Sequence, residues 1–189
     1  MPQPSVLVPL AEGFEELEAI TIIDLLRRAE IKVVVAGLKE GPIRASRNTL
    51  HLADMTLEQA LKQKYEMVVL PGGLPGADHL NADPRIHTLL QQMAAEARYT
   101  AAICAAPKVL ADAGLLDGKE ATSYPGCLNK SQAILVEDAD VVTDGKVVTS
   151  RGPGTAMDFA LELIELLLGA EKREQVEEQI GRASCRERV

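Results

Sequence analysis

Residues 5–38, SVLVPLAEGFEELEAITIIDLLRRAEIKVVVAGL, contain the pattern that decides the fold. Residues 5–10 form a short apolar run, and residues 31–38 form a second run, rich in β-branched residues, that is typical of a buried strand. Between them, apolar residues recur at helical spacing up to Arg27 and Arg28, and basic residues suit the C-terminal end of a helix. The order strand, helix, strand predicts parallel strands joined by a covering helix.

The same alternation of strands and helices continues along the chain. Further strands are expected in YEMVVLPGG and YTAAIC, hairpins in residues 39–54 and 139–150, and helices in residues 83–97, 105–114, 154–169 and 171–180. Asp83 is expected to cap the first of these helices before Pro84, Thr155 to cap the long apolar helix, and Gly169 to end it. Several strands are continuous apolar runs, so the pattern predicts a doubly wound α/β fold, a mostly parallel sheet with helices on both faces.

Length and composition indicate an ordinary globular protein. The 189 residues, 47% hydrophobic and 25% charged, suit a single domain, which we expect to span residues 1–180. A formal charge of -8 argues against binding to nucleic-acid phosphates or to anionic membranes. No apolar run is as long as a transmembrane helix and no signal peptide is recognisable, so we expect a cytoplasmic location.

The three cysteines, Cys104, Cys127 and Cys185, have no CxxC spacing and indicate reduced thiols, without a disulfide framework or a zinc site. Cys185 lies in GRASCRERV, residues 181–189, which bring three arginines without apolar periodicity. We expect this segment to be a disordered tail or a sequence added for expression.

Cys104 lies where the strand YTAAIC gives way to a helix, at the sheet edge where α/β proteins bind ligands. The N-terminus of that helix is expected to lower the thiol pKa, and the small residues around Cys104 fit a nucleophile elbow. The N–H of Ala105 and a second N–H from the Gly72–Gly73 turn would then stabilise an oxyanion. A buried, inert structural cysteine is the alternative.

A base for this thiol is expected among the carboxylates, because all three histidines precede Cys104 and suit surface positions. Glu15 and Glu18 fall on the apolar side of the first helix, and burial raises a carboxyl pKa towards neutrality, which suits a proton shuttle. Glu15 is expected to complement the helix dipole in the first turn. For Glu18 two roles are open: it complements the helix dipole, or it acts as a catalytic acid. The PGGLPGAD turn has neither the GxxxxGK(S/T) nor the GxGxxG spacing of nucleotide-binding loops, so no nucleotide cofactor is expected.

Five motifs occur in order and with matching spacing between residues 5 and 170: EGFEELEA, RRAEIKVVVAGL, VVLPGGLPGA, AAICAAP and TSRGPGTAMDFAL. Together they resemble the ThiJ/PfpI superfamily, and within it the Parkinson-disease protein deglycase subfamily and the bacterial ThiJ/YajL-like proteins. The resemblance implies a flavodoxin-like three-layer α/β sandwich that forms a homodimer and needs no metal, glutathione or nucleotide. It also implies site residues: catalytic Cys104 and Glu18, oxyanion donors Gly73 and Ala105, and substrate-binding Gly72, Tyr124, Arg28 and Arg47.

One position departs from the human member of the family, which has a histidine before the proline. This chain has Tyr124 before Pro125, as YajL-like members have an aromatic residue there, so a mechanism that rests on Cys104 and Glu18 is favoured. Ala105 follows the cysteine where the protease-like branch has histidine, which argues against peptidase activity.

The resemblance implies one of two functions. The first is a glyoxalase or deglycase that acts on methylglyoxal-type dicarbonyls or early glycation adducts through a Cys104 nucleophile and a Glu18 proton shuttle. The second is a redox-sensing stress chaperone that is regulated by oxidation of Cys104. Both functions use the same residues, so the sequence does not rank them.

Overall fold

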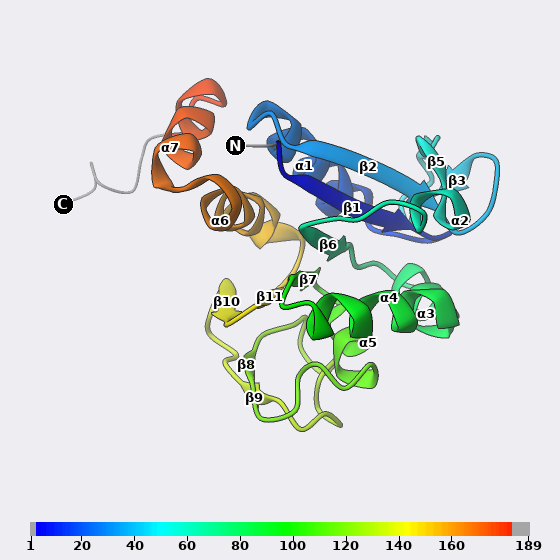
Figure 1. Ribbon diagram of the computed structural model, residues 1–189. Coiled ribbons are helices and arrows are strands. Elements are labelled where there is room, and N and C mark those ends of the chain that lie inside the picture. The colour runs from blue at the N-terminus through cyan, green and yellow to red at the C-terminus, as the bar shows by residue number, and fades with distance from the viewer. Residues whose placement is uncertain (1–2, 183–189) are drawn as a thin grey trace.

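The computed structural model describes residues 3–182. Within them a seven-stranded sheet has the order β10-β11-β7-β6-β1-β2-β5, and only the β10–β11 pair is antiparallel. Its strands are β1 (Ser5–Leu10), β2 (Lys32–Gly37), β5 (Met55–Thr56), β6 (Met67–Leu70), β7 (Tyr99–Ile103), β10 (Val141–Asp144) and β11 (Val147–Ser150). The prediction of a mostly parallel sheet is confirmed (Figure 1).

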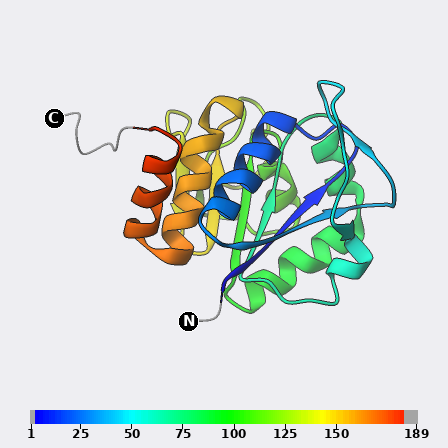
Figure 2. The ribbon, with the colours of Figure 1, turned by 90° about the horizontal axis from the view of Figure 1, so that it is seen from above.

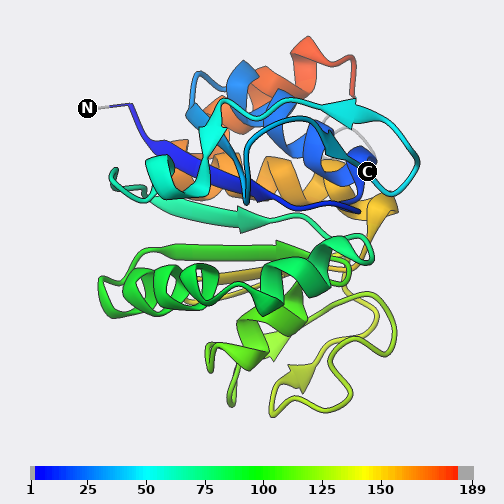
Figure 3. The same ribbon diagram turned by 90° about the vertical axis from the view of Figure 1, so that its right-hand side faces the viewer.

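Helices cover both faces of the sheet. They are α1 (Glu16–Arg28), α2 (Leu57–Ala60), α3 (Gly76–Ala82), α4 (Pro84–Ala95), α5 (Pro107–Asp112), α6 (Ala156–Leu168) and α7 (Ala170–Gln179), with a 3-10 turn η1 (Pro153–Thr155) before α6. Figure 3 shows the sheet between one layer that contains α1, α6 and α7 and a second layer that contains α3, α4 and α5. Figure 2 shows α1, α6 and α7 lying side by side.

Strand periodicity explains the two layers. Successive side chains of a strand point to opposite faces, so Val6 and Val8 of β1 enter one core while Leu7 enters the other. The first core lies under α1 and α6 and includes Phe159, and the second lies under α3, α4 and α5 and includes Leu90. The expected three-layer α/β sandwich is therefore the observed fold.

Both predicted hairpins are present. The strands β3 (Ile43–Arg44) and β4 (Leu50–His51) pair antiparallel outside the main sheet, and β10 pairs with β11 across Gly145 at φ 62°. A further small sheet joins β8 (Glu120–Ala121) to β9 (Ile134–Leu135). The hairpin formed by β3 and β4 matters for the site, because it brings residues 46 and 47 to the start of α1.

One helix start differs from expectation. Asp83 caps α4 as predicted, but the Thr155 hydroxyl bonds within the turn before α6, at 2.9 Å from the Gly152 carbonyl oxygen, and does not cap the helix. In α7, the final helix, Val176 is buried against the core under α1 and α6.

The limits of a single domain at residues 1–180 stay a prediction, and residues 183–189, with Cys185, lie outside the described residues. Between residues 3 and 182 no helix has the length and apolar character needed to span a membrane.

Candidate active site

Cys104 occupies a strained turn between β7 and α5. Its φ of 63° lies in the left-handed region, which non-glycine residues rarely adopt, and two hydrogen bonds hold the turn in place. The Cys104 N–H donates to the carbonyl oxygen of Ser150 at 2.9 Å, and the Cys104 carbonyl oxygen accepts from the Tyr124 N–H at 2.8 Å. This geometry is that of a nucleophile elbow, which projects the thiol from the end of the strand.

Glu18 lies in the first turn of α1 and its side chain is fully buried. Its Oε2 accepts a hydrogen bond of 2.8 Å from the N–H of Gly72, in the turn after β6. Its Oε1 is also buried and has no hydrogen-bond partner among the described residues. The Cys104 thiol is close enough to affect the pKa of this carboxyl, although no hydrogen bond of regular geometry joins the two groups.

Burial raises the pKa of Glu18 to about 7, and the hydrogen bond from the Gly72 N–H opposes this rise only in part. A buried carboxyl oxygen without a partner favours the protonated form, because a proton on that oxygen allows it to donate a hydrogen bond. Near neutral pH, Glu18 therefore exists both as acid and as base, which is the condition that suits a proton shuttle.

The expected low pKa of the Cys104 thiol is wrong for the free protein. Burial, followed by the negative charge of Glu18, raises the pKa of Cys104 to about 12. The N–H groups of Gly73 and Ala105 point at the sulfur and oppose this rise, but α5 has only six residues and its dipole is weak. The negative charge of Glu18 opposes the thiolate, so the thiol ionises more easily when Glu18 is protonated.

Cys104 opens into a cavity of about 360 Å³ at the carboxyl ends of β1, β6 and β7. The residues that line it come from six segments of the chain and are Glu15, Ser46, Arg47, Gly73, Leu74, Cys104, Ala105, Tyr124, Cys127 and Pro153. The sheet order places it beside the boundary between β1 and β6, where the chain connections diverge and α/β proteins bind ligands.

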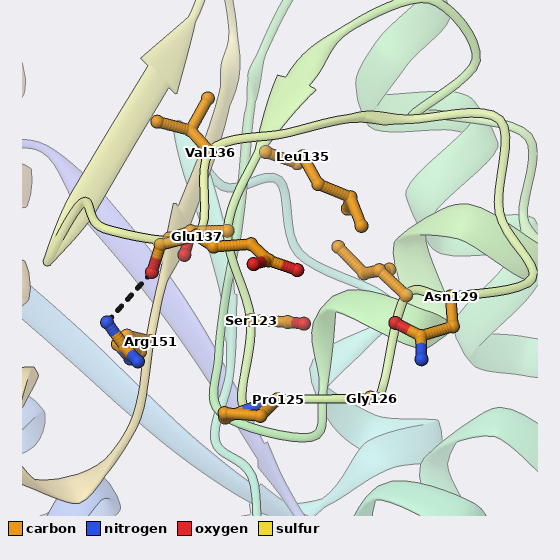
Figure 4. Close-up of a pocket in the computed structure, with 11 residues that line it drawn as sticks. Ser123, Pro125, Gly126, Asn129, Leu135, Val136, Glu137 and Arg151 are labelled. Carbon is orange, nitrogen blue, oxygen red and sulfur yellow. Dashed lines mark hydrogen bonds between the residues drawn. The ribbon is translucent and has the colours of Figure 1, made fainter.

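A second, smaller hollow lies on the other side of the turn that carries Tyr124. It has a volume of about 90 Å³, and Figure 4 shows Ser123, Asn129 and Arg151 around it. Arg151 donates a hydrogen bond of 2.8 Å to the carbonyl oxygen of Glu137 there. This hollow contains neither Cys104 nor Glu18, so it is not the candidate active site.

Comparison with known proteins shows which family this chain belongs to. The model of the DJ-1/PfpI family matches residues 4–166. The chain belongs to the DJ-1/PfpI family. Protein dj-1beta of Drosophila melanogaster is 46% identical over 177 residues, which cover 91% of this chain and 94% of that protein.

Other DJ-1/PfpI relatives extend the comparison to structure and to a named activity. The crystal structure of Drosophila melanogaster DJ-1beta superposes with a TM-score of 0.91 at 44% identity and covers 96% of this chain and 100% of that chain. A Caenorhabditis elegans protein named glutathione-independent glyoxalase DJR-1.2 is 32% identical over 173 residues, or 90% of this chain and 92% of that protein. The DJ-1/PfpI family therefore includes glyoxalase-type enzymes.

Most of the residues that the sequence marked meet at this DJ-1/PfpI site. Gly72, Gly73 and Ala105 surround the Cys104–Glu18 pair, and Tyr124 lines the cavity with an exposed fraction of 53%. None of the three histidines lines the cavity. Within the described residues, no group of three or more His, Cys, Asp and Glu side chains is placed to hold a metal ion.

Of the two arginines that the sequence marked, Arg47 reaches the cavity and Arg28 does not. Arg28 lies in the last turn of α1, about 15 Å along the helix from Glu18, and pairs with Asp24 at 2.7 Å. Within one copy of the chain it does not reach the cavity, so a substrate-binding role for Arg28 is not supported there. Arg47 does line the cavity, and its guanidinium makes no hydrogen bond to residues 3–182.

Ser46 and Cys127 are site residues that the sequence did not mark. The Ser46 hydroxyl donates to Glu15 Oε2 at 2.8 Å and to Glu16 Oε2 at 3.1 Å, which fastens the β3–β4 hairpin to the start of α1. Nothing local in the sequence signals this contact, because it joins residues about thirty positions apart. Cys127 reaches the cavity through the turn that follows Tyr124.

Replacing Gly72 with alanine is expected to push the Cys104 and Glu18 side chains apart. A Cβ at this position would lie 2.7 Å from the Cys104 Cβ, 2.8 Å from Glu18 Oε2 and 2.8 Å from the carbonyl oxygen of Ile103. We expect Gly72→Ala to lower the free energy of unfolding by about 1–3 kcal/mol, as overpacking does, in urea denaturation. Gly154→Ala is the matched control, since a Cβ there meets no atom within 4 Å. Equal stability of the two variants would contradict the expectation.

Proposed function

We propose that this protein is a cofactor-independent glyoxalase or deglycase that acts on methylglyoxal-type dicarbonyls or on early glycation adducts. The observation that carries the proposal is the buried Glu18 carboxyl, with a pKa of about 7 and an unpartnered oxygen, beside the thiol of a nucleophile elbow. The name of the Caenorhabditis elegans relative, a glutathione-independent glyoxalase, supports the same class of reaction.

In the first step, the Cys104 sulfur adds to the aldehyde carbon of the dicarbonyl. The thiol proton passes to Glu18, whose unpartnered Oε1 gains a hydrogen to donate. The aldehyde oxygen becomes the negatively charged oxygen of a hemithioacetal. The N–H groups of Gly73 and Ala105, which lie at the Cys104 sulfur, are the proposed donors that stabilise it.

In the second step, Glu18 moves a proton between adjacent carbons. Glu18 first gives the thiol proton to the negatively charged hemithioacetal oxygen and so becomes a base again. It then removes the hydrogen from the carbon bonded to sulfur and returns it to the neighbouring carbonyl carbon. The hydroxyl proton of the hemithioacetal passes to the former ketone oxygen, which leaves a thioester of a 2-hydroxy acid. Water then cleaves the thioester, releases a product such as lactate and restores the thiol. Methylglyoxal plus water thus becomes lactate with no net oxidation, so the scheme needs no redox partner.

The test is the conversion of methylglyoxal to lactate by the purified protein in buffer without glutathione. Formation of lactate in proportion to protein concentration is expected. Failure to form lactate, while the protein is folded and its thiol is reduced, would contradict the proposal and leave redox sensing as the second candidate. Redox sensing is favoured by the same unpartnered Glu18 Oε1, which would face an oxidised Cys104 sulfur.

Tyr124 is proposed to shape the cavity and not to act as a base. Its phenol makes no hydrogen bond within residues 3–182, so no described group there is placed to pass a proton through it. Tyr124→Phe keeps the ring, so its turnover of methylglyoxal should lie within a few-fold of the unaltered protein. Tyr124→Ala should open the cavity and shift the ratio of kcat/KM between methylglyoxal and bulkier dicarbonyls. If Tyr124→Phe were as inactive as Cys104→Ala, the phenol would belong to the proton path.

Two further proposals concern the state of the protein. We propose a homodimer, because Leu17 and Ile20 of α1 and Met157 at the start of the adjacent α6 leave large apolar side chains exposed. We also propose a reducing compartment such as the cytoplasm, because both described cysteines are free thiols. Small dicarbonyls are the proposed ligands, and a role in nucleic-acid binding is not proposed.

A further inference from the structure

Cys127 is a second thiol at the active-site cavity that the proposed function does not use. Cys104 and Cys127 are both partly buried and both line the same cavity of about 360 Å³. Tyr124 connects their backbones. Its N–H donates to the Cys104 carbonyl oxygen at 2.8 Å, and its own carbonyl oxygen accepts from the Cys127 N–H at 3.1 Å. Two thiols that share one small cavity can react with each other.

We propose that Cys127 is a resolving cysteine, which forms an intramolecular disulfide with Cys104 after a peroxide has oxidised Cys104 to the sulfenic acid. This inference rests on the proposed function only in taking Cys104 as the reactive thiol. It adds a peroxide-reducing activity to the same site, with hydrogen peroxide or a small organic hydroperoxide as substrate.

The chemistry balances in two steps. The Cys104 thiol attacks the peroxide, breaks the O–O bond and becomes the sulfenic acid, while the peroxide leaves as water or an alcohol. The Cys127 sulfur then attacks the Cys104 sulfur, an S–S bond forms, and the sulfenic hydroxyl leaves with the Cys127 proton as water. The peroxide gains two electrons and the two thiols lose two. An added dithiol reverses the disulfide.

The order of the two oxidations follows from their surroundings. The Cys104 thiol has the Glu18 carboxyl beside it to receive its proton. Cys127 has the ion pair of Lys108 and Asp78 nearby, and burial raises the pKa of its thiol. Within residues 3–182 no carboxylate accepts a hydrogen bond from Cys127, so no described group is placed to receive its proton when a peroxide is attacked.

The disulfide requires the turn that carries Cys127 to bring its sulfur to Cys104. Disulfide formation requires Cα atoms about 4.4–6.8 Å apart and an S–S bond of about 2.05 Å. Residues 122–133 form no helix or strand, and the turn around Cys127 is held by the backbone hydrogen bonds of Tyr124 to Cys104 and to Cys127. The segment also lies between two hollows: Cys127 lines the large cavity, whereas Pro125 and Gly126 line the small one that Figure 4 shows.

The test is mass spectrometry of the full-length protein after mild treatment with hydrogen peroxide, digested without reductant. We expect a peptide pair, two hydrogens lighter than its parts, that joins Cys104 to Cys127. The link should disappear in Cys127→Ser and in Cys127→Ala, so a folding defect of one variant does not decide the result. In both variants we expect sulfinate on Cys104 to form about tenfold faster, because no thiol intercepts the sulfenic acid. Cys185→Ser is the matched control and should keep the link.

Loss of methylglyoxal turnover on oxidation gives a second readout. Treatment with dithiothreitol should restore turnover to the oxidised unaltered protein but not to oxidised Cys127→Ser, since thiols do not reduce a sulfinate. Sulfinate on Cys104 at equal rates in the unaltered protein and in Cys127→Ser, with no linked peptide, would overturn the inference. So would a link from Cys104 to Cys185 or between chains. The peptide link is read without any dicarbonyl, so the absence of glyoxalase activity would refute the proposed function and leave this inference standing.

Discussion

Replacing Cys104 with alanine is expected to lower the turnover of methylglyoxal by about a thousandfold or more, as removal of a covalent nucleophile does. In the proposed mechanism the hemithioacetal holds the substrate while Glu18 moves a proton between its two carbons. Without the sulfur no hemithioacetal forms, so neither the addition nor the proton transfer can take place. Lactate formation measured over a range of methylglyoxal concentrations gives kcat/KM for the variant and for the unaltered protein.

The fold of the Cys104→Ala variant serves as its own control. Alanine tolerates the left-handed turn about as well as cysteine, and the hydrogen bonds of residue 104 to Ser150 and Tyr124 are made by backbone groups. We therefore expect the free energy of unfolding to change little in urea denaturation. A folded variant that keeps its turnover would show that the thiol is not the nucleophile.

The second large effect is expected for Glu18→Gln. Glutamine fills the same volume, and its carbonyl oxygen still accepts the hydrogen bond from the Gly72 N–H, but it can neither take nor return a proton at neutral pH. Turnover of methylglyoxal should fall by about 100-fold or more, the range for a positioned acid–base group. In the unaltered protein kcat should rise as the pH passes through about 7, where Glu18 becomes a base. Unchanged turnover would assign the proton transfer to another group, and Glu15 would be the next to test.

Glu18→Gln should also change how stability depends on pH. The pKa of Glu18 rises from 4.5 to about 7 on folding, so the folded protein holds a proton that the unfolded chain releases. At about 1.4 kcal/mol per pH unit, this costs the unaltered protein about 3 kcal/mol of unfolding free energy as the pH rises from below 4.5 to above 7. The variant lacks this loss, so it should be the more stable protein at pH 8 and should lose the advantage below pH 4.5.

Glu16→Gln provides a control in which the change in stability at pH 8 has the opposite sign. The Glu16 carboxylate accepts hydrogen bonds from the Arg47 N–H and the Thr49 hydroxyl, and these contacts lower its pKa despite some desolvation. The carboxylate therefore stabilises the fold above its unfolded pKa, and Glu16→Gln should be less stable than the unaltered protein at pH 8. The free energy of unfolding, measured by urea denaturation at pH 5 and pH 8, distinguishes Glu18→Gln from Glu16→Gln. The same pH dependence in both variants would contradict the role of burial at Glu18.

The amino-acid sequence by itself determined the features that depend on neighbours along the chain. Apolar periodicity located the strands around residues 5–10 and 31–38 and the helix between them, and it placed Glu18 on the buried side of that helix. The turn at Gly145 and the cap at Asp83 were also predictable, since a few adjacent residues specify them. The position of Cys104 at the end of a strand followed from the same local pattern.

Only the tertiary structure decided what the site residues meet. The pKa of the Cys104 thiol depends on burial and on the charge of Glu18, which outweigh the short helix that follows the cysteine. Arg47 and Cys127 reach the cavity because a hairpin and a turn fold over the sheet edge, whereas Arg28 points away at the far end of α1. The reason is physical: periodicity reports which face of an element is buried, but distances between turns are set by strand order and register, which join segments far apart in the chain.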